Sequence, residues 1–256
     1  MILAWVCFYD AWLAIVVIAA GMICAHFRLV PPFAGFQLML AGLVFAALGL
    51  ITGLIALPMT IFSAKRRPAR GRALMGTVFS LLILIPIVLV LAKTHRYPLI
   101  NDITTDPDHP PVFVMAVNLQ PSPGRDMTYN PRTAAIQKAA PAYADLAPLK
   151  IDGPPDEVFK KVQILAGEDP AWQVTRNDPQ THTLEGVATS RLFRFHDDFI
   201  IEVRPAAGGG SLVEMRSKSR DGTGDLGVNY HRIVRFLNYL KTGPQTLPPG
   251  SAQVQP

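Results

Sequence analysis

The hydrophobic residues of this chain are concentrated in its first third. Three apolar runs, at about residues 8–28, 34–62 and 74–93, each have the length that crosses roughly 30 Å of hydrocarbon. Prolines inside the second and third runs are compatible with membrane helices, because neighbouring helices satisfy the freed backbone groups. Residues 1–93 are therefore expected to form a transmembrane region of three helices.

Charge is distributed unevenly around these runs. The loop of residues 65–72 carries five cations, whereas the connection near Arg28 carries one. Short basic loops stay on the cytoplasmic side of a membrane, so the N-terminus is expected in the cytoplasm and the chain after Lys93 outside. In a Gram-negative bacterium these locations are the inner membrane and the periplasm. Since the loop accounts for the net charge of +5, no nucleic-acid partner is expected.

Polar residues dominate after the third run. Residues 94–150 are rich in Pro, Asp, Asn and Thr, which is typical of an irregular segment that joins a membrane region to a domain. Regular patterning begins near Pro154, and residues 151–242 are expected to form a soluble domain. The tail of residues 243–256 is rich in Pro, Gln, Ser and Gly and is expected to be disordered.

The pattern within the soluble domain predicts a helix, a series of strands and a second helix. The expected helices cover residues 154–167 and 225–241, and the expected strands cover residues 172–175, 181–195, 199–204 and 211–219. His196–Asp198 is predicted to be a tight turn. Both helices are amphipathic and the antiparallel sheet needs a cover, which predicts a two-layer α+β fold with the two helices on one face.

A cluster of charged and hydroxyl residues lies where the last expected strand meets the last helix. Strand alternation predicts that the cations and the serines of Arg216–Arg220 lie on opposite faces. Asp225, or Thr223, is expected to cap the helix. The candidate ligand-binding residues are Asp197, Asp198, Arg216, Ser217, Ser219, Arg220, Asp225, Asn229 and Arg232.

Two interpretations of this cluster remain open. In the first, Arg216 or Arg220 pairs with Asp225 or with Asp197 and Asp198, so that the ion pairs lock the fold. In the second, the helix N-terminus, the serines and the arginines bind a phosphate or carboxylate. The acids inside the cluster favour the first interpretation, because they already neutralise the cations.

Catalysis and metal binding have weaker support in the sequence. Ser217 or Ser219 can be drawn into a triad with a histidine and an aspartate, but no Gly-x-Ser-x-Gly turn is present to fix the geometry. The histidines lack zinc-like spacing, and both cysteines, Cys7 and Cys24, lie in the first apolar run. No metal, disulfide or cofactor is therefore expected.

The motif also resembles a known family. Leu192-Phe-Arg-Phe-His-Asp-Asp, Arg216-Ser-Lys-Ser-Arg-Asp-Gly-Thr-Gly-Asp-Leu-Gly-Val-Asn and Arg232-Ile are similar to a bacterial and chloroplast, membrane-anchored family, domain of unknown function 1499. The stretch Asn101–Phe113 is similar to a segment that precedes the domain in many members. The resemblance covers roughly residues 101–240 and implies that the Pro-rich segment belongs to the domain. It implies no activity.

Together these patterns predict a multi-pass inner-membrane protein with a periplasmic α+β domain. A non-enzymatic binding, accessory or assembly role is the leading hypothesis. The expected partners are the lipid bilayer and either another membrane or periplasmic protein or a small anionic ligand. The alternative is a periplasmic hydrolase or transferase that uses the Asp/Arg/Ser cluster.

Overall fold

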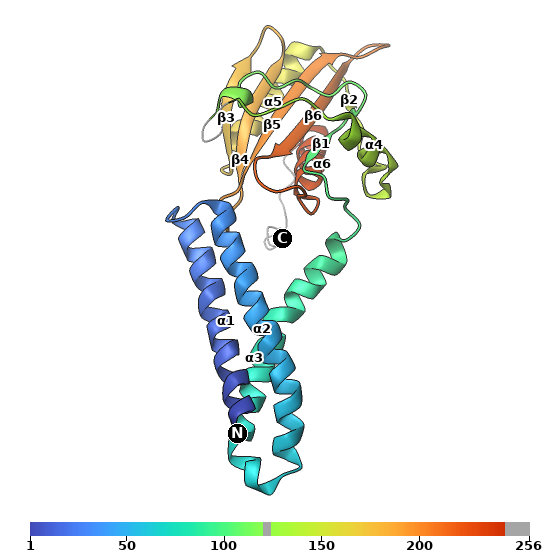
Figure 1. Cartoon of the computed structure of the whole chain (residues 1–256). Coiled ribbons are helices and arrows are strands. Elements are labelled where there is room, and N and C mark those ends of the chain that lie inside the picture. Colours follow the sequence, from blue (N-terminus) through green and yellow to red (C-terminus); the bar gives the residue numbers. More distant parts are fainter. Residues whose placement is uncertain (120–123, 244–256) are drawn as a thin grey trace. The chain divides into compact units, whose positions relative to one another are not determined.

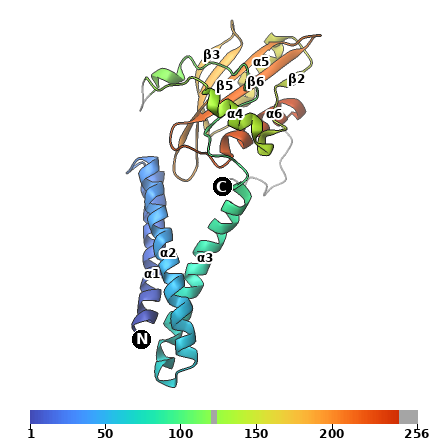
Figure 2. The same ribbon diagram turned by 45° about the vertical axis from the view of Figure 1, so that its right-hand side comes forward.

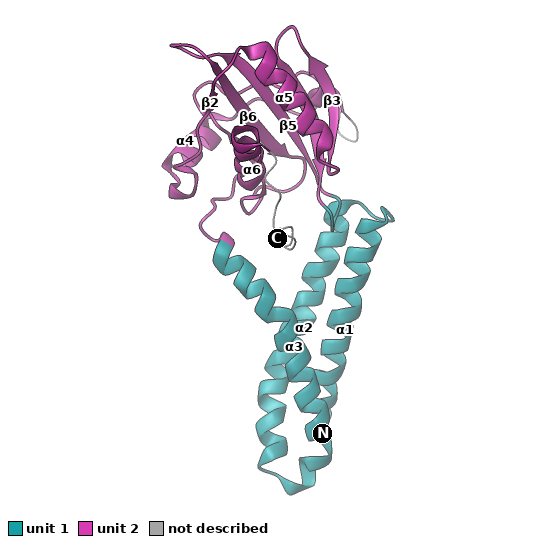
Figure 3. Cartoon of the chain, turned by 180° about the vertical axis from the view of Figure 1, so that it is seen from behind, with its two compact units in different colours: residues 1–93, 191–194 teal, residues 94–190, 195–256 magenta. Residues whose placement is uncertain are grey.

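The computed structural model describes residues 1–119 and 124–243, in two compact units. One unit comprises Met1–Lys93 with the short segment Arg191–Arg194, and the other comprises the remaining described residues from Thr94 onward (Figure 3). The predicted disordered tail, apart from Gly243, lies outside the described residues.

Three helices of the first unit are long and apolar enough to cross a membrane, which confirms the predicted helical region. They are α1 (Ile2–His26), α2 (Pro32–Ile61) and α3 (Arg70–Thr94), and the short helix η1 (Ala64–Ala69) leads into α3 (Figure 1). Small residues let α1 and α2 approach closely: a methyl group on Gly35 would lie 2.5 Å from the Cβ of Ala25.

The second unit is an α+β domain built on an antiparallel sheet, as predicted, and the sheet has six strands where four were expected. The strand order is β1-β6-β5-β4-β3, and β2 also pairs with β6. The strands are β1 (Asp102–Thr104), β2 (Leu149–Ile151), β3 (Trp172–Asp178), β4 (Thr183–Thr189), β5 (His196–Pro205) and β6 (Ser211–Ser219). The helices are α4 (Pro131–Ala139), α5 (Pro155–Glu168) and α6 (Val228–Thr242), with short turns η2 (Ala116–Asn118) and η3 (Pro141–Tyr143).

Helices α5 and α6 cover one face of this sheet (Figure 3). Each presents an apolar stripe at helical spacing, and these stripes meet alternate residues of the central strands. The resulting core contains Val158, Phe159, Val162, Leu184, Phe199, Ile201, Val213, Met215, Ile233, Phe236 and Leu237, all buried. The predicted layer of two helices on one face of the sheet is therefore confirmed.

The irregular chain of residues 105–119 and 124–130 covers the opposite face of the sheet (Figures 1 and 2). Phe113, Ala116 and Met127 are buried against Ile200 of β5 in a second, smaller core. Residues 94–150, predicted from composition to be a joining segment, thus supply two strands, a helix and this cover. We call the described part of residues 105–130 the covering segment.

Two details of the predicted strands are wrong. Strand β4 ends at Thr189 and β5 begins at His196, so there is no strand through residue 195 and no turn at Asp197–Asp198. The chain reverses over residues 190–194, where Arg194 has φ +62° and the Ser190 hydroxyl accepts a hydrogen bond from the Phe195 amide at 2.8 Å. The alternating aromatic residues there imitate a strand pattern.

Candidate functional site

The residues of the motif lie on both faces of the sheet, because neighbouring residues of a strand point to opposite sides. The register pairs Asp198 of β5 with Lys218 of β6. Consequently the cations of the motif share a face with Asp198, and the serines share the other face with Asp197. The first network contains Asp198, Arg216 and Arg220, and the second contains Asp197, Ser217, Ser219, Asp225, Asn229 and Arg232.

Arg216 is the central residue of the first network and is only 1% exposed. Its Nε and Nη2 donate to the two carboxylate oxygens of Asp102 in β1, both at 2.8 Å. Nη1 donates to the carbonyl of Pro111 at 3.1 Å, and Nη2 also donates to the carbonyl of Met127 at 2.7 Å. These hydrogen bonds attach both β1 and the covering segment to β6.

The flat surfaces of the Arg216 guanidinium meet aromatic rings. Its central carbon lies 4.9 Å from the ring centre of Phe113 and 5.1 Å from that of Tyr129. Burial, followed by the nearby charge of Asp102, raises the pKa of the Tyr129 phenol, so this ring stays neutral. The guanidinium is thus enclosed by hydrogen bonds at its edges and by rings at its faces.

Asp198 is fully buried between two further arginines. Arg125 of the covering segment donates from Nη2 to Oδ2 at 2.6 Å. Arg220 donates from Nη2 to Oδ1 at 2.7 Å and from Nε to Oδ2 at 3.1 Å. One carboxylate therefore joins the end of β6 to the covering segment.

The second network connects α6 to the sheet. Arg232 forms an ion pair with Asp197 and donates from Nη1 to the Ser217 hydroxyl at 2.8 Å. The Ser217 hydroxyl donates to Oδ1 of Asn229 at 2.8 Å, and Nδ2 of Asn229 donates to the Ser219 hydroxyl at 3.0 Å. The two serines thus satisfy a buried amide and a guanidinium.

Asp225 secures the beginning of α6, although the helix starts at Val228, three residues later than predicted. Its carboxylate accepts hydrogen bonds from the amides of Gly227 at 2.9 Å and Asn229 at 2.8 Å. Gly227 precedes the helix with φ +87°, and a methyl group there would lie 2.5 Å from the Tyr97 ring. Burial raises the pKa of Asp225, while the two backbone hydrogen bonds act in the opposite direction.

His231, one histidine that a catalytic triad could use, is engaged elsewhere. Nε2 of His231 lies 3.0 Å from the hydroxyl of Tyr97, away from the bonds described for Ser217. Burial, then the charge of Arg96, lowers the pKa of this imidazole. Within the described ranges, no three His, Cys, Asp or Glu side chains are grouped so that they could hold a metal ion.

Sequence reasoning missed two partners of the motif, Asp102 in β1 and Arg125 in the covering segment. Asp102 has a signal in the sequence, since it lies in the Asn101–Phe113 stretch that carries the family resemblance. For Arg125 the sequence offers only a charge inside a Pro- and Gly-rich stretch, and that pattern is typical of an exposed loop. Its contact with Asp198 depends on how the chain returns across the sheet.

Glu185 is a third missed residue and is 1% exposed in β4. Its carboxylate accepts hydrogen bonds of 2.9–3.1 Å from the backbone amides of Val114, Met115 and Ala116. Such a carboxylate acts as an anchor for backbone amides, in the way an anion sits at a helix N-terminus. The available signal was an acidic residue at an otherwise apolar strand position.

An open cleft of about 380 Å³ lies where the C-terminal end of α5 and the second half of α6 meet the beginning of β3. Its lining is aromatic and aliphatic, with the Arg235–Asp169 ion pair of 2.9 Å at its side. The lining residues are Leu165, Glu168, Asp169, Pro170, Trp172, Arg235, Phe236 and Tyr239, and they include none of the predicted site residues. This volume falls in the range of small-ligand pockets.

Comparison with known proteins gives one match. No curated protein and no solved structure matches the chain. The model of the family described as "Protein of unknown function (DUF1499)" matches residues 102–240, which begin with β1 and end within α6. The matched region includes Asp102, the covering segment and the whole motif, so the chain belongs to the DUF1499 family.

Proposed function

We propose that this chain is an inner-membrane protein whose α+β domain faces the periplasm and serves a non-enzymatic, accessory or assembly role. The observation that carries the proposal is the internal pairing of the motif. Asp102 binds Arg216 and Asp198 binds Arg220, so the charges that an enzyme would direct at a substrate connect parts of the domain to one another.

The closed pairing of the motif argues against catalysis at this position. A general base or a nucleophile needs to reach a substrate atom at hydrogen-bonding distance. Arg216 and Asp198 are instead nearly inaccessible, and the Ser217 hydroxyl lies between Asn229 and Arg232. We infer that the motif acts as a clamp that holds the covering segment and α6 on the sheet.

A binding role then depends on a surface outside the motif. The cleft at the ends of α5 and α6 is the place we propose, because Trp172 and Tyr239 offer aromatic surface beside the Arg235–Asp169 pair. Aromatic residues and arginine dominate the energetics of protein interfaces. A periplasmic segment of a partner protein is the class of ligand that fits this lining.

The proposed orientation rests on the basic segment of residues 65–72, which joins α2 to α3. Fusions of a reporter enzyme that is active only in the periplasm test it. A fusion after Thr94 is expected to be active, and a matched fusion within residues 65–69 is expected to be inactive. The reverse pattern would place the domain in the cytoplasm and overturn the proposal.

The proposal that the motif is a clamp, not a ligand site, is tested by measuring whether small anions raise the melting temperature of the full chain. Inorganic phosphate and acetate are expected to leave the melting temperature of the domain unchanged, because Arg216 and Arg220 already hold carboxylates. Stabilisation by phosphate that disappears in Arg220→Lys would favour the anion site instead. Arg220 is suited to this test because its side chain lies nearer the surface than that of Arg216.

A further inference from the structure

Asp10 in α1 is the single acidic residue among residues 1–93. It is half-buried, and within the described chain its carboxylate has neither a hydrogen bond nor an ion pair. The arginines and lysines of residues 1–93 lie toward the ends of the helices and in the loops: Arg28, Lys65, Arg66, Arg67, Arg70, Arg72 and Lys93. Among the described residues, Asp10 therefore has no cation paired with its carboxylate.

The depth of Asp10 follows from its neighbours in the other two helices. A methyl group on Gly49 of α2 would lie 3.4 Å from the Cβ of Asp10 and 2.7 Å from the hydroxyl oxygen of Ser80 in α3. Asp10 therefore lies at the level of Gly49 in α2. Gly49 precedes Thr60 by eleven residues, so this level is about 16 Å along the helix from Thr60. Half the thickness of the hydrocarbon is roughly 15 Å.

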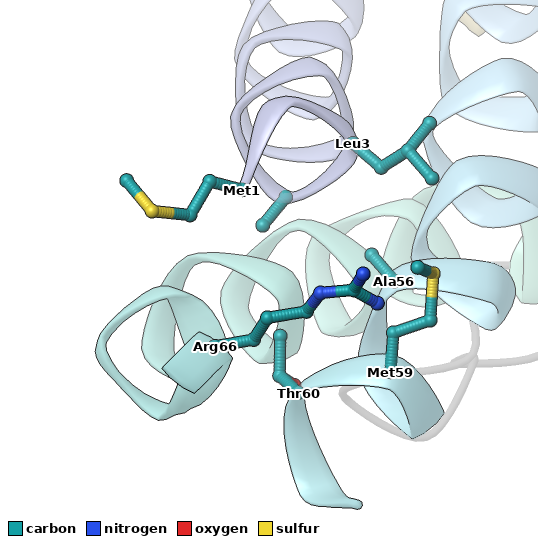
Figure 4. Close-up of a pocket in the computed structure, with 7 residues that line it drawn as sticks. Met1, Leu3, Ala56, Met59, Thr60 and Arg66 are labelled. Carbon is teal, nitrogen blue, oxygen red and sulfur yellow. The ribbon is translucent and has the colours of Figure 1, made fainter. Parts of the chain in front are cut away.

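Thr60 marks the basic end of the helices. It lines a small crevice of about 20 Å³ together with Ala56 and Arg66, and Figure 4 shows the Arg66 side chain beside Thr60 at this end. An arginine side chain sits most favourably where hydrocarbon meets headgroups. If Arg66 lies at that boundary, Asp10 lies close to the middle of the bilayer.

A second polar group without a partner lies next to Asp10. The hydroxyl of Ser80 is completely buried and makes no hydrogen bond to the described residues. Other hydroxyls in these helices do have partners, since Thr77 donates to the Ala73 carbonyl at 2.7 Å and Thr52 to the Leu48 carbonyl at 2.8 Å. The polar region around Asp10 is thus incomplete within this chain.

Asp10 is accessible from the lipid side, whereas Ser80 is not. The helix neighbours of Asp10 on one side, Val6 and Leu13, are 38% and 42% exposed, and those on the other side, Cys7 and Ala14, are buried. The carboxylate therefore lies at the border between packed and lipid-facing surface, where another transmembrane helix can reach it.

We propose that Asp10 is the docking contact for a transmembrane helix of another protein that carries a lysine or arginine at the same depth. The inference extends the accessory role proposed above by naming the class of partner. Charged residues in the bilayer interior occur paired with one another, because an isolated charge there is costly. A second copy of this chain does not fit, since it would bring a second carboxylate and no cation to this level.

The experiment uses the purified full chain in liposomes together with synthetic transmembrane peptides. One Leu/Ala-rich peptide carries a central lysine, and its control carries leucine at that position. Association is measured by energy transfer between a label on the chain and a label on the peptide. The lysine peptide is expected to associate about fivefold more tightly than the leucine peptide, and this preference is expected to vanish in Asp10→Asn.

Matched controls make each outcome decisive. Val16→Asn places an amide on the exposed surface of α1 and is expected to keep the lysine preference, since Asp10 remains. Equal binding of both peptides by the native chain, or an undiminished preference in Asp10→Asn, would overturn the proposal. Self-association of the chain that requires Asp10 would also overturn it, in favour of a second copy. None of these results depends on which side of the membrane the domain occupies.

Discussion

Arg216 and Asp102 form a bidentate ion pair, with both hydrogen bonds at 2.8 Å, between the last strand of the sheet and the first. The two residues are far apart in sequence, and both side chains are almost fully buried. Removing one member of a buried ion pair leaves the other charge without compensation, and this typically costs about 3–5 kcal/mol. The pair therefore links β1, at the start of the domain, to β6, its last strand.

Arg216→Ala is expected to lower the free energy of unfolding of the domain by about 3–5 kcal/mol, because it leaves the Asp102 carboxylate buried and unpaired. Urea unfolding of the full chain in detergent, followed by hydrogen exchange of the β5 and β6 amides, measures this change. Lys218→Ala is the matched control: Lys218 lies 3.2 Å from the same carboxylate but is more exposed, so a loss below about 1 kcal/mol is expected. Equal losses in both variants would contradict the central role of Arg216.

Asp197 and Asp198 provide a second test, since the two neighbours are expected to act on opposite faces of the sheet. Asp198→Asn weakens the contact with Arg125 and is expected to speed hydrogen exchange in the covering segment. Asp197→Asn weakens the contact with Arg232 and is expected to speed exchange in the first turns of α6. The paired variants serve as controls for each other. Identical exchange patterns would show that the two networks are coupled rather than separate.

The sequence predicted the elements of this fold better than their contacts. The apolar stripe of α6 and the alternation of β6 are local periodic patterns, so they were readable without knowledge of the rest of the chain. The bonds from Arg216 to Pro111 and Met127 depend instead on where an irregular segment crosses the sheet, and no periodicity encodes that path. The same limit explains why Asp197–Asp198 was predicted to be a turn: a pair of aspartates is typical of turns unless each has a buried cation.

Glu185 gives a third prediction, on the attachment of the covering segment. Glu185→Ala removes the acceptor of the backbone amides of Val114, Met115 and Ala116 and leaves these amides without their acceptor. Hydrogen bonds to charged groups contribute about 1.5–3 kcal/mol each, so the segment is expected to become sensitive to proteases before the sheet unfolds. Limited proteolysis with mass spectrometry locates the cleavage.

The control for this variant is Glu168→Ala, which changes an exposed acidic residue at the end of α5. It is expected to leave the cleavage pattern of residues 105–130 unchanged. Cleavage that appears first at other loops in Glu185→Ala would indicate that the carboxylate stabilises β4 rather than the covering segment.

His231 predicts how stability depends on pH. His231 keeps an exposed surface, but the partial burial of its imidazole, then the charge of Arg96, lowers its pKa below the ordinary value of 6.5. The unfolded chain therefore binds a proton more readily than the folded domain, so the contribution of His231 is fully present above pH 6.5 and is lost as the pH falls below it. The urea midpoint of the native chain is expected to decrease as the pH is lowered from 7.5 to about 5.5.

The control variant is His231→Gln, which keeps a polar group near Tyr97 but does not titrate. A smaller decrease of the urea midpoint is expected in this variant. An equal decrease in both proteins would assign the pH dependence to groups other than His231. Asp225 is not such a group, because its pKa is raised and its contribution to stability is therefore lost as the pH rises, not as it falls.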